Sequence, residues 1–263
     1  MPARIIQITD LHLFADPAAE LKEICTRERL ERVLAALRAE LPRAELLIVT
    51  GDLAHDERLE TYAAVRELLV DWLPRVRVLP GNHDDRGFMR QVFGDIVLAA
   101  GERNVFVESA GKWRLMGLDS QIPGAVAGEL GAPQLGWLEE QLIASPQPTV
   151  LFLHHPPVGV GSPWLDEIGL SDAVALWQLL DRFPQVKILC TGHIHQEMTI
   201  RHGQTLVLTT PSTAVQFRPE TESLVVDNLP PGYRILELED DGSVRTRVIR
   251  VVPPRRDQDS GGW

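Results

Sequence analysis

The chain has 263 residues, 44% of them apolar, which is enough to bury a full hydrophobic core in one large domain. Its formal net charge of −11 argues against a nucleic-acid binder, because neutralising phosphate groups requires a basic face. The two cysteines, Cys25 and Cys190, lie far apart in the sequence and do not suggest a disulfide framework or a cysteine-based zinc site.

Residues 4–9 read as a strand, and the first apolar stretch, Ile5 to Ile8, is too short to be a signal peptide. No later run approaches the roughly 20 apolar residues that cross a membrane. We therefore expect a soluble cytoplasmic protein with neither a membrane nor a nucleic acid as its partner.

The rest of the first half alternates helical and extended patterns. Apolar residues recur at helical spacing between 26 and 41, where Thr26 is the expected N-cap, and a second helix is expected from about 59 to 72. The strands around them are expected at 45–50, which is nearly all apolar, and at 76–79. This strand-helix-strand-helix-strand order predicts an α/β fold with parallel strands.

The second half continues the pattern and then changes it. In chain order we expect a helix at 87–93, a hairpin of strands 105–108 and 113–118, a helix with Pro133 in its first turn running to Ile143, a strand at 149–153, a helix capped by Ser171 and running to Phe183, and a strand at 186–190. Strands at 205–210, 232–238 and 244–252 then predict an antiparallel sheet. We expect a single domain over 1–252 and a disordered tail over 253–263.

Polar clusters follow five of the expected strands. Taken singly, each reads as an ordinary turn or helix cap, but six of the eight histidines fall within them. Ligands of open α/β sheets bind outside the carboxyl ends of the strands, so we expect the clusters to form one site. The clusters are Asp10-Leu-His12, Gly51-Asp52, Gly81-Asn82-His83-Asp84, His154-His155 and Gly192-His193-Ile-His195.

The donor types in these clusters indicate a metal site. They are carboxylates, an amide oxygen and imidazoles without thiolate, a mixture suited to Mn, Fe or Zn. Seven such ligands are too many for one ion but suit two ions that share a carboxylate. We expect the D-x-H and H-x-H segments to be extended, so that alternate side chains face one cavity, and the glycines at 51, 81 and 192 to allow sharp turns. The seven residues are Asp10, His12, Asp52, Asn82, His154, His193 and His195.

This series of five blocks resembles the calcineurin-like metallophosphoesterase superfamily. A closer likeness is to the class III bacterial 3′,5′-cyclic AMP phosphodiesterases of the CpdA type, and it extends from the first strand to about Val251. The resemblance implies a four-layer αββα sandwich of two mixed β-sheets flanked by helices, with two metal ions, Fe or Mn, or else Zn. The residues that carry it are Gln7-Ile-Thr-Asp-Leu-His-Leu-Phe14, Leu118-Asp-Ser-Gln121, His154-His-Pro-Pro157, Gly192-His-Ile-His-Gln-Glu197 and Pro211-Ser-Thr-Ala-Val-Gln-Phe217.

The resemblance also implies roles for single residues. The first metal would be held by Asp10, His12, Asp52 and His195, and the second by Asp52, Asn82, His154 and His193, so that Asp52 bridges the two. The expected reaction converts 3′,5′-cyclic AMP to 5′-AMP, with a water activated between two ions about 3.5–4 Å apart as the nucleophile.

His83 is expected to act on the substrate without holding metal. It either stabilises the developing negative charge or protonates the leaving 3′-oxygen. The residues expected to contact the substrate are His12, Asp52, Asn82, His83 and His195.

Several alternatives stay open at this point. The substrate could be another phosphodiester, such as a 2′,3′-cyclic nucleotide, or a phosphomonoester, and the intact ligand set disfavours a non-catalytic scaffold. Monomer and homodimer are both compatible with the sequence.

The roles of several residues near the clusters are equally open. Asp84 either orients His83 or caps a helix, and His155 is expected to support the site rather than hold metal. Gln216 and Phe217 could contact a nucleobase but more often such residues are core, and Trp164 either covers the site or anchors a loop. His55 and His202 are expected to be solvated.

Overall fold

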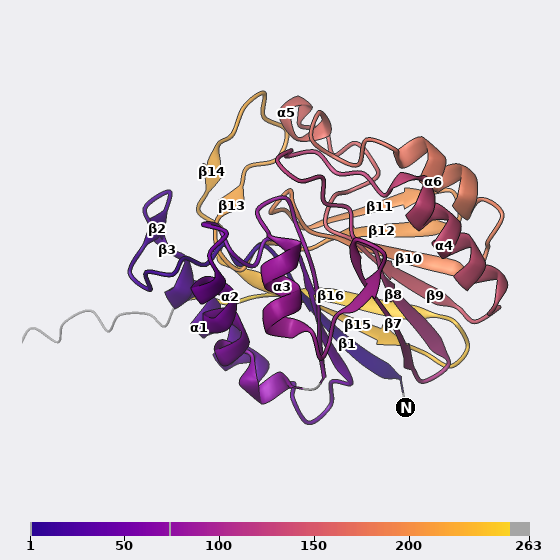
Figure 1. Ribbon diagram of the computed structural model, residues 1–263, viewed down its shortest axis with the longest axis horizontal. Helices are drawn as coiled ribbons and strands as arrows, with labels where there is room; N and C mark the ends of the chain where they lie inside the picture. Colours follow the sequence, from indigo (N-terminus) through magenta and orange to yellow (C-terminus); the bar gives the residue numbers. More distant parts are fainter. Residues whose placement is uncertain (1, 74, 253–263) are drawn as a thin grey trace, which may run out of the picture.

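The computed structural model describes residues 2–73 and 75–252. Two mixed β-sheets pack face to face, and helices cover their outer faces (Figure 1). The first sheet has the strand order β16-β15-β1-β4-β5, with β1 (Ala3–Ile8), β4 (Leu46–Thr50), β5 (Val76–Leu79), β15 (Gly232–Leu238) and β16 (Val244–Arg250). The second has the order β11-β12-β10-β9-β8-β7-β6, with β6 (Leu98–Ala100), β7 (Arg103–Ala110), β8 (Trp113–Gly117), β9 (Thr149–Phe152), β10 (Val186–Thr191), β11 (Met198–His202) and β12 (Thr205–Thr209).

The remaining elements are helices and two short strand pairs. The helices are α1 (Thr26–Leu37), α2 (Leu59–Leu68), α3 (Arg86–Phe93), α4 (Gly131–Ile143), α5 (Pro163–Asp166) and α6 (Ala173–Leu180), with a 3₁₀ turn at Val70–Trp72. The pairs are β2 (Glu20–Leu21) with β3 (Ile24–Cys25), and β13 (Gln216–Phe217) with β14 (Val226–Asp227). No helix in the described part of the chain is long and apolar enough to cross a membrane.

Three apolar cores hold four layers together. Ile5 and Ile48 of the first sheet pack with Phe152 of the second between the sheets. On the outer faces, Leu30 of α1 belongs to the core under α1, α2 and α3, and Leu138 of α4 to the core under α4 and α6. The α/β class with two mixed sheets between helices is therefore confirmed. The division into one domain over 1–252 stays a prediction, and the tail at 253–263 lies outside the described residues.

Both sheets contain parallel strands whose carboxyl ends meet at one edge. In the first sheet β1, β4 and β5 run parallel, and in the second β8, β9, β10 and β12 do. The expectation of an antiparallel C-terminal third is right for β15 and β16, whereas β12 lies in the other sheet and is antiparallel to β11 but parallel to β10. The reason is β11, an edge strand too polar to recognise from its pattern, which reverses the chain so that β12 returns parallel to β10.

Two helix caps differ from the sequence prediction. Thr26 is the first residue of α1 rather than its cap, and its hydroxyl donates to the carbonyl of His12 at 2.9 Å. Ser171 also caps no helix, because its hydroxyl donates to the carbonyl of Gly128 at 2.8 Å. The Thr26 hydroxyl ties the start of α1 to the loop that follows β1, and the Ser171 hydroxyl ties two loops together.

Buried hydrogen bonds join the two sheets directly beneath the strand ends. The side-chain amide of Gln7 donates to Thr50 Oγ1 at 2.9 Å and to the Thr191 carbonyl at 3.1 Å, and its oxygen accepts from the Thr210 hydroxyl at 2.6 Å. All four residues are fully buried. Because an unsatisfied buried polar group costs about 1–3 kcal/mol, this network favours one register between β1, β4 and β10.

Candidate metal centre

Asp52 lies between two histidines that come from different sheets. Its Oδ2 is 3.5 Å from Nε2 of His12, in the loop after β1, and 3.5 Å from Nε2 of His154, in the loop after β9. Its Oδ1 accepts a hydrogen bond from the backbone N–H of His83 at 3.0 Å. The Asp52 carboxylate is therefore placed so that one oxygen could serve two metal ions, one beside His12 and one beside His154.

Asp10 has a similar place on the other side of His12. Its Oδ1 is 3.3 Å from Nε2 of His195, and its carboxylate accepts from the backbone N–H of His193 at 3.1 Å. Two groups that include a carboxylate have their ligand atoms within 4.8 Å of one another: Asp10 with His12 and His195, and Asp10 with Asp52 and His154. Two further groups of this kind contain histidines alone, namely His12, His55 and His83, and His154, His155 and His193.

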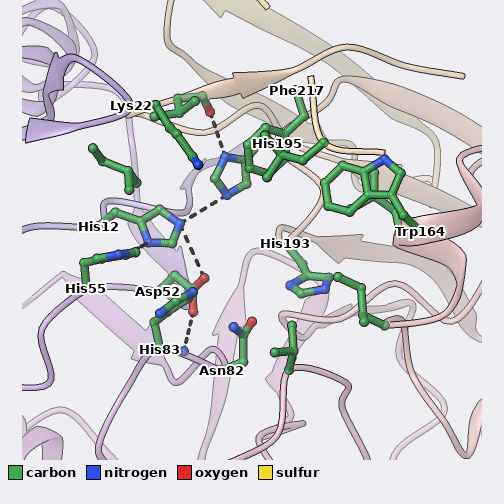
Figure 2. Close-up of a pocket in the computed structure, with 16 residues that line it drawn as sticks. His12, Lys22, Asp52, His55, Asn82, His83, Trp164, His193, His195 and Phe217 are labelled. Atoms are coloured by element: carbon green, nitrogen blue, oxygen red, sulfur yellow. Dashed lines mark hydrogen bonds and ion pairs between the residues drawn. The ribbon is translucent and has the colours of Figure 1, made fainter. Parts of the chain in front are cut away.

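Asn82, from the loop after β5, completes the convergence of the five strand ends. Its Oδ1 is 3.2 Å from Nε2 of His154. Figure 2 shows Asn82, Asp52 and His193 pointing toward the same space. All seven residues predicted as ligands thus lie in one region, although they are spread over nearly two hundred positions of the sequence.

Hydrogen bonds to backbone carbonyls fix the orientation of two of these rings. His154 donates from Nδ1 to the Thr50 carbonyl, and His195 donates from Nδ1 to the Val215 carbonyl, both at 2.7 Å. In its neutral form each of these rings presents an Nε2 lone pair to the centre. His193 Nε2 is buried and has no hydrogen-bond partner among the described residues. An unpaired buried nitrogen in a centre that contains two carboxylates fits a bound cation.

The charge distribution in the centre fits the same conclusion. Burial lowers the pKa of both His12 and His193 to about 3, so these rings are neutral and able to ligate at physiological pH. Burial also lowers the pKa of His154, but Asp52 and Asp10 outweigh it and raise that pKa to about 9. For Asp52, burial raises the pKa, but His154 outweighs burial and holds the pKa well below its usual range. Two buried carboxylates thus attract positive charge to this place.

The backbone at five of the seven predicted ligand positions is left-handed, not extended. The alternating-side-chain argument for D-x-H and H-x-H is therefore wrong, and the side chains converge because the chain turns tightly at each of them. A non-glycine residue in this region costs about 1–2 kcal/mol, so strain is concentrated at the centre. The φ angles are 54° at Asp10, 46° at His12, 53° at Asp52, 69° at His193 and 54° at His195.

Of the three glycines beside the clusters, only Gly51, with φ of 97°, makes the sharp turn that was expected. At Gly81 an added Cβ would lie 2.1 Å from Asp52 Oδ1, and at Gly192 it would lie 2.0 Å from Thr9 Oγ1. These two glycines are required by close approach between loops, not by a turn.

His83 and His55 form a stacked pair at the pocket wall (Figure 2). Their ring centroids are 4.6 Å apart with an interplanar angle of 24°, and His55 Nδ1 is 3.1 Å from His12 Nδ1. The expectation that His55 is solvated is wrong, because it is half-buried and lines the pocket. Its place three residues after Asp52 was the available signal. His202 is exposed, as expected.

Asp84 neither orients His83 nor caps a helix. Its buried carboxylate accepts from the backbone N–H groups of Leu53 at 3.0 Å, Ala54 at 3.1 Å and Gly81 at 2.9 Å, and from the Tyr62 hydroxyl at 3.2 Å. It thereby ties the loop that carries Asp52 to the loop that carries Asn82. Burial and the charge of Asp52 raise the pKa of Asp84 to about 7, and the three N–H donors oppose that rise. The helix cap is the next residue, Asp85.

Removal of the Asp84 carboxylate, which acts as a clamp between these two loops, should destabilise the protein. We expect Asp84→Ala to lower the free energy of unfolding by about 2–4 kcal/mol, because it leaves several buried donors unsatisfied. Asp85→Ala is the matched control, since Asp85 only caps α3 by accepting from the Phe88 N–H at 2.8 Å, and it should cost about 1 kcal/mol. Urea unfolding of both variants measures the difference. Equal costs would contradict the clamp.

His155 uses both ring nitrogens outside the centre. Nδ1 lies 2.8 Å from the Ser120 hydroxyl, and Nε2 lies 3.0 Å from the Val126 carbonyl. Its ring is buried and contacts His154 and His193. Both nitrogens of the His155 ring have partners, so neither is free to bind a metal. His155 supports the centre by packing against His154 and His193.

A cavity of about 220 Å³ opens over the centre, and Phe217 and Trp164 line it. The structure separates the two members of the Gln216-Phe217 pair. Gln216 is buried, donates to the Ser212 carbonyl at 2.8 Å and accepts from Arg250 at 2.9 Å, so it is not available to a ligand. Phe217 instead stacks on His195 at 4.2 Å with an interplanar angle of 8°.

Comparisons with known proteins agree with this architecture. The 3′,5′-cyclic adenosine monophosphate phosphodiesterase CpdA of Pseudomonas aeruginosa is 39% identical over 263 residues, which cover 98% of this chain and 94% of the relative. The protein of the same name from Escherichia coli is 39% identical over 258 residues, covering 98% and 93%. A 3′,5′-cyclic-nucleotide phosphodiesterase of Nostoc is 35% identical over 252 residues, covering 95% and 93%.

Solved structures share the fold at lower identity. A dimetal phosphatase from Danio rerio superposes with a TM-score of 0.67 at 15% identity, covering 96% of this chain and 100% of that one. A purple acid phosphatase from yellow lupin gives 0.66 at 15% identity, covering 95% and 54%. The family model described as calcineurin-like phosphoesterase matches residues 3–197. This chain therefore belongs to the calcineurin-like phosphoesterase family.

Proposed function

We propose that this protein is a dinuclear-metal phosphodiesterase that hydrolyses 3′,5′-cyclic AMP to 5′-AMP and so lowers a second messenger in the cytoplasm. The family is hydrolytic, and the relatives that match nearly the whole chain are named as phosphodiesterases of this nucleotide. The observation that carries the proposal is the placement of Asp52 between His12 and His154, in a centre where the buried His193 Nε2 has no hydrogen-bond partner among the described residues.

Members of this family bind two metal ions, and the described residues form two His/Asp groups of the kind that hold one. We propose Fe or Mn, with Zn as the alternative, because the donors are hard or intermediate and include no thiolate. The proposed first set is Asp10, His12, Asp52 and His195, and the proposed second set is Asp52, Asn82, His154 and His193. When bound, the two metals supply a nucleophile at neutral pH and neutralise charge on the phosphate.

The side chains of the chain then position the substrate. His12, Asp52, Asn82, His83 and His195 line the cavity, so a phosphate at the centre lies within their reach. His83 is held by its backbone bond to Asp52 and by its stack on His55, and these contacts leave its ring to act on the substrate. We propose that it assists departure of the 3′-oxygen, either by protonating it or by stabilising its charge.

A panel of substrates tests the proposal. We expect the metal-loaded protein to hydrolyse 3′,5′-cyclic AMP with higher kcat/KM than 2′,3′-cyclic AMP or nitrophenyl phosphate monoesters. Product analysis should give 5′-AMP, since the 3′-oxygen is the leaving group. Faster turnover of a 2′,3′-cyclic nucleotide or of a monoester would assign the site to that substrate class instead. Turnover of no phosphoester would make the chain a non-catalytic scaffold and sink the proposal.

A further inference from the structure

The cavity over the centre has two halves of different chemistry (Figure 2). One half contains the histidines with Asp52 and Asn82. The other half is apolar and is formed by α5, the residues around it, and the loops that join β13 to the centre and to β14. Its main side chains are Trp164, Leu165, Ile168, Val215, Phe217 and Leu224. With the proposed metal ions bound in the first half, a ligand that fills the cavity has one anionic end and one apolar end.

The apolar half contains no side chain that could read the edge of a base. Apart from the histidines, Asp52 and Asn82, the only polar side chain in the described lining is that of Lys22, from the turn between β2 and β3. Among the described residues that line the apolar half, none has a hydroxyl, amide or carboxylate side chain. A ring bound there is held by contact area and stacking, and its exocyclic groups meet no selective side chain.

The aromatic part of this wall is held in place before any ligand arrives. Trp164 lies edge-on to Phe217, with ring centroids 5.5 Å apart and an interplanar angle of 66°. Its Nε1 donates to the Thr221 hydroxyl at 3.4 Å, and one face of Phe217 is covered by His195. The stack of Phe217 on His195 joins the apolar half to the centre, so a ligand with its phosphate at the centre extends toward Trp164.

Leu224 lies at the rim of the same wall and is 41% exposed. It belongs to the loop between β13 and β14 that also carries Thr221, the partner of Trp164. Exposed large apolar side chains grouped at the mouth of a cavity are typical of a binding surface, because a ligand removes them from water.

We propose that Trp164, Phe217 and Leu224 form a nucleobase subsite, which binds purine rings by stacking and does not distinguish adenine from guanine. This inference rests on the proposed function, which places the cyclic phosphate at the metal centre. The further inference is that the preference among bases depends on the stacking area of the base, which is larger for purines than for pyrimidines. Cyclic AMP and cyclic GMP should therefore have kcat/KM values within about 10-fold of each other, and both should exceed cyclic CMP and cyclic UMP.

The test compares nucleotides with a base-free diester, methyl riboside 3′,5′-cyclic phosphate. In Trp164→Ala, the ratio of kcat/KM for cyclic AMP to that for the base-free diester should fall about 10- to 100-fold, mainly through KM. Trp164→Phe should restore most of the ratio. Trp164 is the residue to change because, unlike Phe217, it does not stack on a proposed metal ligand.

Calorimetric binding of adenosine and guanosine separates this inference from the proposed function. If cyclic nucleotides are not hydrolysed but adenosine binds the wild type and not Trp164→Ala, the proposed function fails and the subsite stands. If cyclic AMP is hydrolysed and the ratio in Trp164→Ala is unchanged, the subsite is wrong. A preference above about 100-fold for cyclic AMP over cyclic GMP would overturn the claim that adenine and guanine are not distinguished.

Discussion

Asp52→Asn should lose both metal ions and lower kcat by about 10³-fold or more. Asp52 Oδ2 lies 3.5 Å from both His12 Nε2 and His154 Nε2, so the change removes a negative charge shared by both proposed metal sites. The asparagine keeps the shape and still accepts from the His83 N–H. Loss of about 4 kcal/mol of transition-state stabilisation corresponds to about 10³-fold in rate. Elemental analysis and steady-state kinetics on the same preparation measure both effects.

Asp119→Asn is the matched control for this experiment. Asp119 is as buried as Asp52, but its carboxylate binds the Arg86 guanidinium at 2.6 and 2.9 Å, and it belongs to none of the His/Asp groups of the centre. We expect this variant to unfold at a lower temperature and to keep two metals. Loss of metal from both variants would mean that general destabilisation empties the site. Retention of both metals by Asp52→Asn would remove Asp52 from its proposed bridging position.

The place of the centre could be predicted from the sequence because it depends on local signals. Each strand that ends at the site is a short apolar run, and the polar residues that follow it mark where the run stops, as at Thr50 before Gly51 and Asp52. Parallel strands bring such ends to one edge whatever the order of the strands. The convergence of Asp10, Asp52 and His154 therefore followed from patterns of four to six residues.

The contacts of Asp84 and His55 could not be predicted in the same way, since they depend on which loops become neighbours. Asp84 binds N–H groups about thirty positions earlier, and a strand-end aspartate gives no sign of this. His55 stacks on His83 from a different strand-end loop. The left-handed backbone at His12 and His195 was missed for a related reason, because tertiary contacts impose a conformation that neither residue prefers.

The separate environments of Gln216 and Phe217 could not be predicted from the sequence. Neighbouring residues in a strand point to opposite faces, and they form the short strand β13. Gln216 therefore points into the protein interior and Phe217 into the cavity. Gln216 belongs to the core, whereas Phe217 is placed to contact a base. The sequence did not mark β13 as a strand, because the segment is only two residues long.

The last prediction concerns His83, which should act without holding metal. His83→Ala should lower kcat by about 10²- to 10⁴-fold while both metals remain bound. Asn82→Ala, one residue away, should lose metal as well as rate, because Asn82 Oδ1 lies 3.2 Å from His154 Nε2 in the centre. His202→Ala is the control for loss of an imidazole elsewhere, since His202 is exposed and stacks on Trp177, and it should change neither quantity. Equal metal loss in His83→Ala and Asn82→Ala would reject this division of roles.

Comparison of substrates with different leaving groups distinguishes the two roles proposed for His83. A nitrophenolate leaves without a proton, whereas the 3′-oxygen of a cyclic nucleotide is a poor leaving group that benefits from one. If His83 protonates the leaving oxygen, the defect of His83→Ala should shrink to a few-fold with bis(4-nitrophenyl) phosphate. If it stabilises charge on the phosphoryl oxygens, the defect should be similar for both substrates, because those oxygens are common to both. The contact of His83 with His55 at the cavity wall, on the side of the centre away from Trp164, is compatible with either role, so the comparison of substrates is the measurement that separates them.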